Sequence, residues 1–157
     1  MGQEIERKFL VKEHTFKKQY SQKQEIRQGY LCVNKNKVVR IRTLDKKGFL
    51  TVKGKTIGIT RSEFEYEIPK KDALEMLHNL CPSLVEKVRY IVPHEDMQWE
   101  VDEFFNDNQG LILAEIELKN EDQHFSEPPW LGKEVTGDKR YYNASLSEYP
   151  FKKWKHT

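Results

Sequence analysis

The chain has few cysteines and no long apolar run. Its two cysteines, Cys32 and Cys81, lie far apart in the 157 residues and form no CxxC pair, so neither a disulfide framework nor a redox motif is expected. The N-terminal residues have neither the basic nor the apolar region of a secretory signal. No apolar stretch approaches the roughly 20 residues that span a bilayer. These absences predict a reduced, cytoplasmic protein with no membrane partner.

Common catalytic and nucleotide-binding motifs are absent as well. The five histidines follow no ligand spacing such as HExxH, so a zinc site is not expected. There is no GxxxxGKS/T loop and no GxSxG turn, which argues against a P-loop fold and against a serine hydrolase. The charged residues remain as the candidates for chemistry.

The charge balance by itself indicates no particular partner. Charged residues make up 33% of the chain and hydrophobic residues 37%, and 27 basic against 25 acidic side chains leave a formal net charge of +2. This composition is polar but still typical of a globular protein. No low-complexity linker, internal repeat or long run of like charge divides the sequence. We therefore predict a single domain over residues 1–157.

The first predicted strand places three charged residues on one face. Glu4, Glu6 and Lys8 alternate with residues that include Ile5 and Phe9, so they point the same way at a spacing of roughly 7 Å. Two glutamates at this spacing can hold hydrated divalent cations, while the lysine can meet an anion. The alternative is the solvated face of an edge strand, where alternating charge discourages aggregation.

The same alternation of charged and apolar residues recurs along most of the chain. The predicted strands are 3–11, 26–34, 37–43, 48–54, 60–68, 86–93, 98–105 and 111–119. A helix is predicted over 70–80, where an apolar stripe follows Pro69. Shorter helical segments are predicted over 12–20, 120–125 and 138–147. The chain is therefore expected to be mainly β and mostly antiparallel.

The charged faces allow two arrangements. They can face water on an ordinary sandwich or barrel with an apolar core, or they can line the lumen of a closed barrel whose apolar faces lie outside. The charges are segregated by sign, which favours a divided cavity with a cation end and an anion end. Enclosing unpaired charge costs several kcal/mol per ion, so both ends need partners. A bound polyanion would pair with the basic residues, and divalent metals would pair with the carboxylates. The basic faces carry Arg40, Arg42, Lys53, Lys87 and Arg89, and the acidic faces carry Glu4, Glu6, Glu115 and Glu117.

These residues resemble the CYTH, or triphosphate tunnel metalloenzyme, superfamily. Glu4, Glu6 and Lys8 match its N-terminal ExExK signature, and the opening EIERKFLV is similar to that of its short bacterial branch. Further segments match in order and extend the resemblance over nearly the whole chain. They are 28–31, the Arg40 and Arg42 pair, Lys53, Arg61 to Glu65, Lys87 to Tyr90, Glu115 with Glu117, and 134–141.

The resemblance implies a fold and a set of site residues. The fold is α+β but mainly β, a closed eight-stranded antiparallel barrel with a charged lumen and helices packed outside. Implied phosphate ligands are Lys8, Arg40, Arg42, Lys53, Arg61, Lys87 and Arg89. Implied metal ligands are Glu4, Glu6, Glu115 and Glu117, together with Asp102. Glu63, Glu65 and Asp102 would be secondary acidic residues that orient a basic ligand or hold a hydrated or second metal, and each could instead be a structural counter-charge.

The resemblance also implies a reaction. We expect Mg²⁺- or Mn²⁺-dependent hydrolysis of a small-molecule triphosphate, foremost inorganic triphosphate to pyrophosphate and phosphate. Lys8, Tyr30, Glu63 and Glu65 are the catalytic candidates, although Tyr30 is equally compatible with a core position. The alternatives are a class IV adenylate cyclase, a thiamine triphosphatase, or a non-catalytic module that binds polyphosphate or nucleotide.

Nucleic acid is not an expected partner. Carboxylates interleave with the basic residues and would repel a phosphate backbone. We keep a homodimer as an open alternative for the oligomeric state.

Overall fold

Nine strands and a few short helices make up the regular structure in the computed structural model, which describes residues 2–154. The strands are β1 (Gly2–Val11), β2 (Gln22–Val33), β3 (Lys37–Leu44), β4 (Lys47–Gly54), β5 (Thr60–Ile68), β6 (Leu84–His94), β7 (Met97–Phe104), β8 (Ile112–Glu117) and β9 (Leu131–Glu134). The α-helices are α1 (Lys70–Asn79) and α2 (Asn143–Glu148). The 3-10 turns are η1 (Thr15–Lys18), η2 (Asn106–Asn108), η3 (Lys139–Tyr141) and η4 (Phe151–Lys153).

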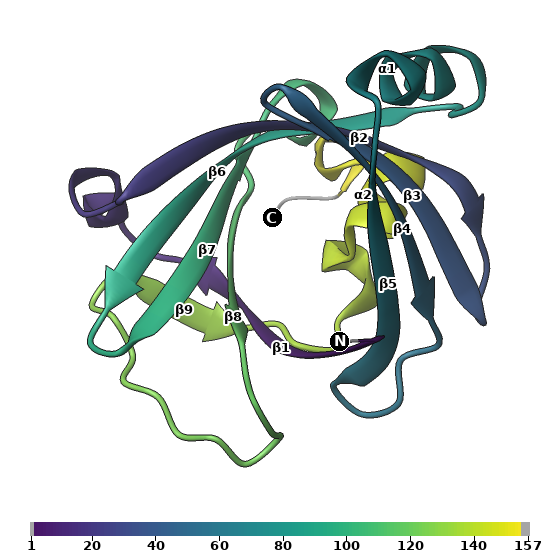
Figure 1. Ribbon diagram of the computed structural model, residues 1–157. Coiled ribbons are helices and arrows are strands. Elements are labelled where there is room, and N and C mark those ends of the chain that lie inside the picture. Colours follow the sequence, from purple (N-terminus) through teal and green to yellow (C-terminus); the bar gives the residue numbers. More distant parts are fainter. Residues whose placement is uncertain (1, 155–157) are drawn as a thin grey trace.

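Strand β1 closes the sheet into a barrel. The strand order is β5-β4-β3-β2-β6-β7-β8-β1-β9, and β1 also pairs with β5. The first half of β1 pairs with β5, with Glu4 opposite Arg61, and the second half pairs with β8, with Glu6 opposite Glu117. Eight antiparallel strands therefore form a closed ring, to which β9 adds along β1 (Figure 1). This confirms the predicted eight-stranded barrel.

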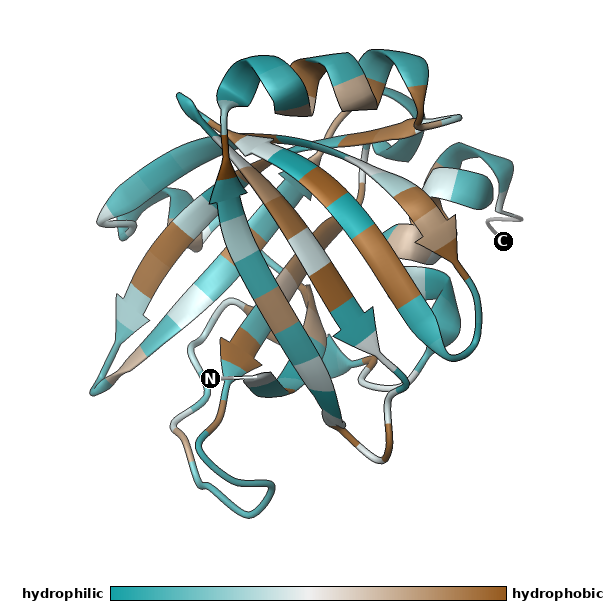
Figure 2. Ribbon diagram, turned by 45° about the vertical axis from the view of Figure 1, so that its right-hand side comes forward, coloured by the Kyte–Doolittle hydropathy of each residue, from teal (hydrophilic) through white to brown (hydrophobic). Residues whose placement is uncertain are grey.

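The largest apolar cluster lies on the outer side of the barrel wall. Because side chains alternate along a strand, Trp99 and Val101 of β7 point away from the lumen residue Asp102. Strands therefore show alternating hydrophilic and hydrophobic bands (Figure 2). Phe16 of η1 and Trp130 before β9 join this cluster, and the Trp99 and Trp130 rings meet edge to face at 5.8 Å. The outer core is thus covered by η1 and by the segment before β9.

Helix α1 also packs outside, against β3 and β4. Its buried residues Ala73 and Leu77 contact Ile41 of β3. Gly48 of β4 permits this close approach, since a Cβ atom at that position would lie 2.8 Å from the Cβ atom of Ala73. The predicted helix over 70–80 is confirmed, with its α-helical part ending at Asn79.

The C-terminal segment differs from α1 because it closes one end of the lumen. Val85, Phe104 and Leu113 lie on the lumen faces of β6, β7 and β8, and they cluster with Tyr141 of η3 and Leu146 of α2. The yellow-green segment that carries η3 and α2 accordingly lies within the ring of strands in Figure 1. One end of the barrel is apolar and filled, and the charged residues occupy the remainder.

Three of the shorter predictions need correction. The helical segment predicted over 120–125 is wrong, because side-chain hydrogen bonds there form turns instead: Lys119 N donates to Gln123, and Asp122 N donates to Asn120. Strand β9 was not predicted, since its four residues are too few to show an alternation. The segment 138–147 contains η3 and α2 rather than one helix, and 12–20 contains only η1.

Within residues 2–154, no helix has the length and apolar character needed to cross a membrane. The single domain predicted over 1–157 stays a prediction, and Met1 and residues 155–157 lie outside the described residues.

The contact between α1 and β4 gives a stability prediction. We expect Gly48→Ala to lower the free energy of unfolding by about 1–3 kcal/mol, because the added methyl group overpacks against Ala73. Gly54→Ala on the same strand is the matched control, since its Cβ atom would lie 3.4 Å from the Cβ atom of Ser62. Urea denaturation measures both variants, and equal stability of the two would contradict the close packing.

Candidate active site

Buried cations line the lumen. Each of them is 9% exposed or less, and burying such a charge costs several kcal/mol unless a partner compensates it. They come from β1, β3, β4 and β6. The buried cations, which we call the basic wall, are Lys8, Arg40, Arg42, Lys53, Lys87 and Arg89.

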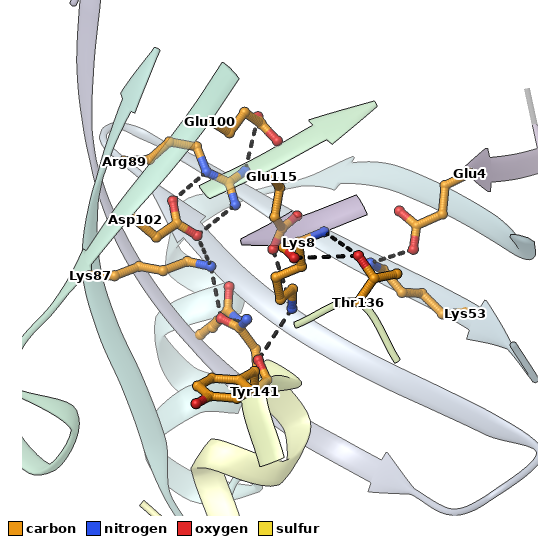
Figure 3. A network of polar contacts seen from close by, with 12 residues as sticks. Glu4, Lys8, Lys53, Lys87, Arg89, Glu100, Asp102, Glu115, Thr136 and Tyr141 are labelled. Carbon is orange, nitrogen blue, oxygen red and sulfur yellow. Dashed lines mark hydrogen bonds and ion pairs between the residues drawn. The ribbon is translucent and has the colours of Figure 1, made fainter. Parts of the chain in front are cut away.

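Asp102 contacts two of these cations and offsets part of their charge. Arg89 donates from Nε to Oδ1 at 2.8 Å and from Nη2 to Oδ2 at 3.0 Å, and Lys87 Nζ lies 2.7 Å from Oδ2 (Figure 3). Burial alone would raise the pKa of Asp102, but Arg89 and Lys87 lower that pKa to about 2. Burial lowers the pKa of Lys87 to about 7 in spite of Asp102. Asp102 thus contacts the basic wall, which favours its orienting role over metal ligation.

Three carboxylates converge near the middle of β1. Oxygen atoms of Glu4, Glu6 and Glu117 lie within 4.8 Å of one another. Burial raises the pKa of Glu6 well above its usual range, and the negative charges of Glu115 and Glu4 raise it further. This repulsion and the hard oxygen donors fit a hydrated divalent cation shared by the three side chains. We refer to Glu4, Glu6 and Glu117 as the acidic trio.

Glu4 also contacts cations from β4 and β5. Its Oε1 atom accepts hydrogen bonds from Lys53 Nζ at 3.0 Å and Arg61 Nε at 2.9 Å. Burial would raise the pKa of Glu4, but a hydrogen bond with Glu63 and the charges of Lys53 and Arg61 lower it well below its usual value. Burial and that hydrogen bond raise the pKa of Glu63 to about 7. Within this carboxyl pair, Glu4 therefore has the lowered pKa and Glu63 the raised one.

Glu115 joins the acidic trio to the basic wall. It lies 3.4 Å from Lys8 Nζ and shares a hydrogen bond with Glu6. Lys8 also donates to the backbone oxygen of Tyr141 at 3.2 Å, which connects β1 to the C-terminal segment. The structure therefore places the predicted ligand Glu115 beside the trio rather than within it.

Arg40 and Arg42 of β3 make longer polar contacts than Arg89 makes with Asp102. Arg40 Nη2 lies 3.5 Å from Glu65 and 3.2 Å from the hydroxyl of Thr51. Arg42 donates from Nε to the amide oxygen of Gln28 at 3.2 Å. Burial, together with the charges of Arg40 and Arg89, lowers the pKa of Arg42 to about 9. This region of the lumen has an excess of positive charge that would attract an anion.

Tyr30 lies next to this region. It is 7% exposed, and its hydroxyl accepts a hydrogen bond from Gln28 Nε2 at 2.9 Å. Burial raises the pKa of the hydroxyl, although Arg40 and Arg42 oppose that shift. The phenol is therefore both a buried aromatic ring and a polar group beside two arginines.

The structure brings the predicted site residues into one lumen, but sequence reasoning missed several that support them. Gln28 was part of a matched segment, but its buried amide was not given a role. Thr136 fixes β1 by accepting a hydrogen bond from Lys8 N at 2.9 Å, and Asn143 contacts Lys87 at 2.8 Å. Neither lies in a strand with an alternating pattern, so no periodic signal indicated them.

Comparison with known proteins identifies the family. The sequence matches the CYTH domain over residues 2–147. It is 48% identical over 156 residues to an inorganic triphosphatase of Acetivibrio thermocellus, with 99% of each chain covered. It is 40% identical over 149 residues to an inorganic triphosphatase of Nitrosomonas europaea, with 92% of this chain and 96% of that protein covered.

A solved structure agrees with these matches. The crystal structure of the inorganic triphosphatase NE1496 superposes with a TM-score of 0.65 at 36% identity, covering 92% of this chain and 93% of that chain. The resemblance read from the ExExK signature is thereby confirmed, and this chain belongs to the CYTH domain family.

Proposed function

We propose that this protein is a divalent-metal-dependent triphosphatase that hydrolyses inorganic triphosphate to pyrophosphate and phosphate. The observation that carries the proposal is the lumen itself, where buried cations face a trio of crowded carboxylates. A linear polyanion with a divalent cation complements both groups. The names of the relatives, which are inorganic triphosphatases at 48% and 40% identity, support the choice of substrate.

The acidic trio would hold the metal ion, with Glu115 beside it. Carboxylate oxygens are the ligands that Mg²⁺ and Mn²⁺ prefer, and the oxygen spacing within 4.8 Å suits a shared cation. When bound, the ion would neutralise phosphate oxygens and act as a Lewis acid. Glu117 is partly fixed already, since Ile5 N lies 3.4 Å from its Oε1 atom.

The basic wall would bind the phosphates and stabilise the charge that develops during transfer. Phosphoryl transfer depends mainly on positioning and electrostatic stabilisation, and buried arginines and lysines supply both. Lys8 is placed to contact a phosphate near the trio, because its ammonium lies 3.4 Å from Glu115. The Tyr30 hydroxyl would donate a hydrogen bond to a phosphate oxygen near Arg42.

Glu63 and Glu65 would act by orienting cations. Glu63 lies 3.4 Å from Lys53, and Glu65 lies 3.5 Å from Arg40. Both carboxylates belong to β5, and both contact a predicted phosphate ligand from a neighbouring part of the wall. Orienting a basic ligand is one of the roles expected for these two residues from the sequence.

The metal requirement is directly testable. We expect excess EDTA to abolish triphosphate hydrolysis and Mg²⁺ or Mn²⁺ to restore it. Glu6→Gln should lower kcat/KM at least about 100-fold, because losing a direct ligand should cost no less than losing an outer-shell contact. Its melting temperature should stay within about 3 °C of wild type, since glutamine resembles the protonated form that the raised pKa of Glu6 favours. Full activity in EDTA would exclude this mechanism.

Glu75→Gln provides the matched control for that variant. Glu75 is exposed on α1, outside the barrel, and its substitution removes one carboxylate without touching the lumen. Its kcat/KM should equal that of wild type.

A substrate panel separates the alternatives. Phosphate release should be measured with inorganic triphosphate, pyrophosphate, ATP and thiamine triphosphate, together with a test for cyclic AMP. We expect kcat/KM to be far higher for inorganic triphosphate than for the others, because the contacts described in the lumen suit phosphates. Cyclic AMP as the main product from ATP would indicate a cyclase. Tight binding of triphosphate without turnover would indicate a binding module.

Ligand binding should also stabilise the fold. A non-hydrolysable triphosphate analogue with Mg²⁺, at about 100 times its dissociation constant, should stabilise the native state by roughly 2.7 kcal/mol. Arg42→Met should melt near wild type without ligand, because it removes a buried charge that Arg40 and Arg89 repel. The analogue with Mg²⁺ should raise the melting temperature of Arg42→Met less than it raises that of wild type. An unchanged wild-type melting curve at saturating analogue would show that the lumen does not bind triphosphate.

A further inference from the structure

A pair of buried amides joins the C-terminal segment to the basic wall. Gln28 of β2 is fully buried, and Asn143 is the first residue of α2. Gln28 Nε2 donates to Asn143 Oδ1 at 3.0 Å and to the hydroxyl of Tyr30 at 2.9 Å. The pair therefore lies where the helix that closes the lumen meets the residues proposed to bind phosphate.

Each amide oxygen also accepts a hydrogen bond from a cation. Arg42 Nε donates to Gln28 Oε1 at 3.2 Å, and Lys87 Nζ donates to Asn143 Oδ1 at 2.8 Å. Arginine and lysine have no acceptor atoms, so these contacts fix which end of each amide faces the cation. The four side chains form one connected network from α2 to β3.

A neutral acceptor fixes a cation without cancelling its charge. Lys87 is almost completely buried and uses one ammonium hydrogen on Asp102 and one on Asn143. An ammonium has three hydrogens, so one remains for a phosphate oxygen. A second carboxylate in place of Asn143 would instead neutralise the positive charge that attracts phosphate. The same reasoning applies to Gln28, which orients Arg42 while leaving its charge intact.

We propose that Gln28 and Asn143 are positioning residues for triphosphate, which act by holding Arg42 and Lys87 in place from the C-terminal segment. This inference rests on the proposed function. It makes η3 and α2 part of the substrate site, since Lys8 also donates to the Tyr141 backbone oxygen at 3.2 Å. Docking of this segment orients cations from β1, β3 and β6 together.

The competing explanation is that the amides only fasten α2 to the barrel. Two substitutions at Asn143 separate the two roles. Asn143→Asp keeps the shape and both accepted hydrogen bonds but adds a negative charge beside Lys87. Asn143→Ala removes both hydrogen bonds. If Asn143 only fastens α2, the Asn143→Asp variant should behave like wild type. If Asn143 positions Lys87, that variant should fold well but bind triphosphate poorly.

The experiment measures melting without ligand, kcat and KM for inorganic triphosphate, and calorimetric binding of the non-hydrolysable analogue with Mg²⁺. We expect Asn143→Asp to melt at or above the wild-type temperature and to raise KM and the dissociation constant at least about tenfold, or about 1.4 kcal/mol. Asn143→Ala should melt lower and raise KM about fivefold through loss of one hydrogen bond to Lys87.

Ser147→Ala is the matched control on the same helix. Its hydroxyl donates to the Ala144 backbone oxygen at 2.8 Å, and its loss weakens α2 without removing a contact to a cation. We expect unchanged KM for this variant. A rise in KM equal to that of Asn143→Ala would show that weakening α2 is sufficient, which would overturn the positioning role.

A double-mutant cycle tests whether Asn143 acts through Lys87. In a Lys87→Met background, the KM effect of Asn143→Ala should largely disappear, because the cation that it orients is gone. Additive effects, or wild-type KM for Asn143→Asp, would overturn the inference while leaving the triphosphatase function intact. Failure of the wild-type protein to bind or hydrolyse triphosphate would overturn both.

Discussion

The barrel depends on compensation of charge inside its lumen. Asp102 is central because it contacts Arg89 through two hydrogen bonds and Lys87 through a third contact, and none of the three is more than 7% exposed. Placing charges inside forces the apolar faces of the same strands outward, since side chains alternate along a strand. Those faces then require a cover, which η1, α1 and the segment before β9 provide. The layout of the fold follows from this arrangement, in which the charged faces of the strands point inward and the apolar faces point outward.

Some lumen cations are paired with a carboxylate and others with a neutral amide. The carboxylate partners stabilise the fold, whereas the neutral partners leave positive charge that can bind an anion. Arg89 and Lys87 are anchored by the carboxylate of Asp102, whose pKa of about 2 keeps it charged at any ordinary pH. Arg42 is anchored by the neutral amide of Gln28, and burial next to other cations lowers its pKa to about 9. The first arrangement offsets the cost of burial. The second leaves positive charge uncompensated where an anion would restore the balance.

The strands and their charged faces were predictable from a period of two, whereas the closed eight-stranded barrel was predicted from the resemblance to the CYTH superfamily. The alternation of Glu4, Glu6 and Lys8 required only that β1 be a strand, and Glu115 and Glu117 follow the same rule on β8. The C-terminal contribution was not predictable in this way. Asn143 lies at the start of a six-residue helix, and its contact with Lys87 spans 56 positions in the sequence. Such a contact depends on tertiary packing, which local periodicity does not encode. Strand β9 was missed because four residues are too few to show an alternation, and the turns near Asn120 were missed because they depend on individual local side-chain hydrogen bonds.

The contacts of Glu4 indicate how the two halves of the lumen depend on each other. Lys53 and Arg61 both donate to the same Glu4 oxygen, although Glu4 belongs to the acidic trio and Lys53 is a proposed phosphate ligand. A cation held by the trio would compete with Lys53 and Arg61 for this oxygen. Lys53 would keep Glu63 as a second negative partner at 3.4 Å, and a bound anion would offset the remaining positive charge. If the trio holds a cation, the shared Glu4 oxygen would link binding of the metal to binding of the anion, and each would favour the other by the same factor.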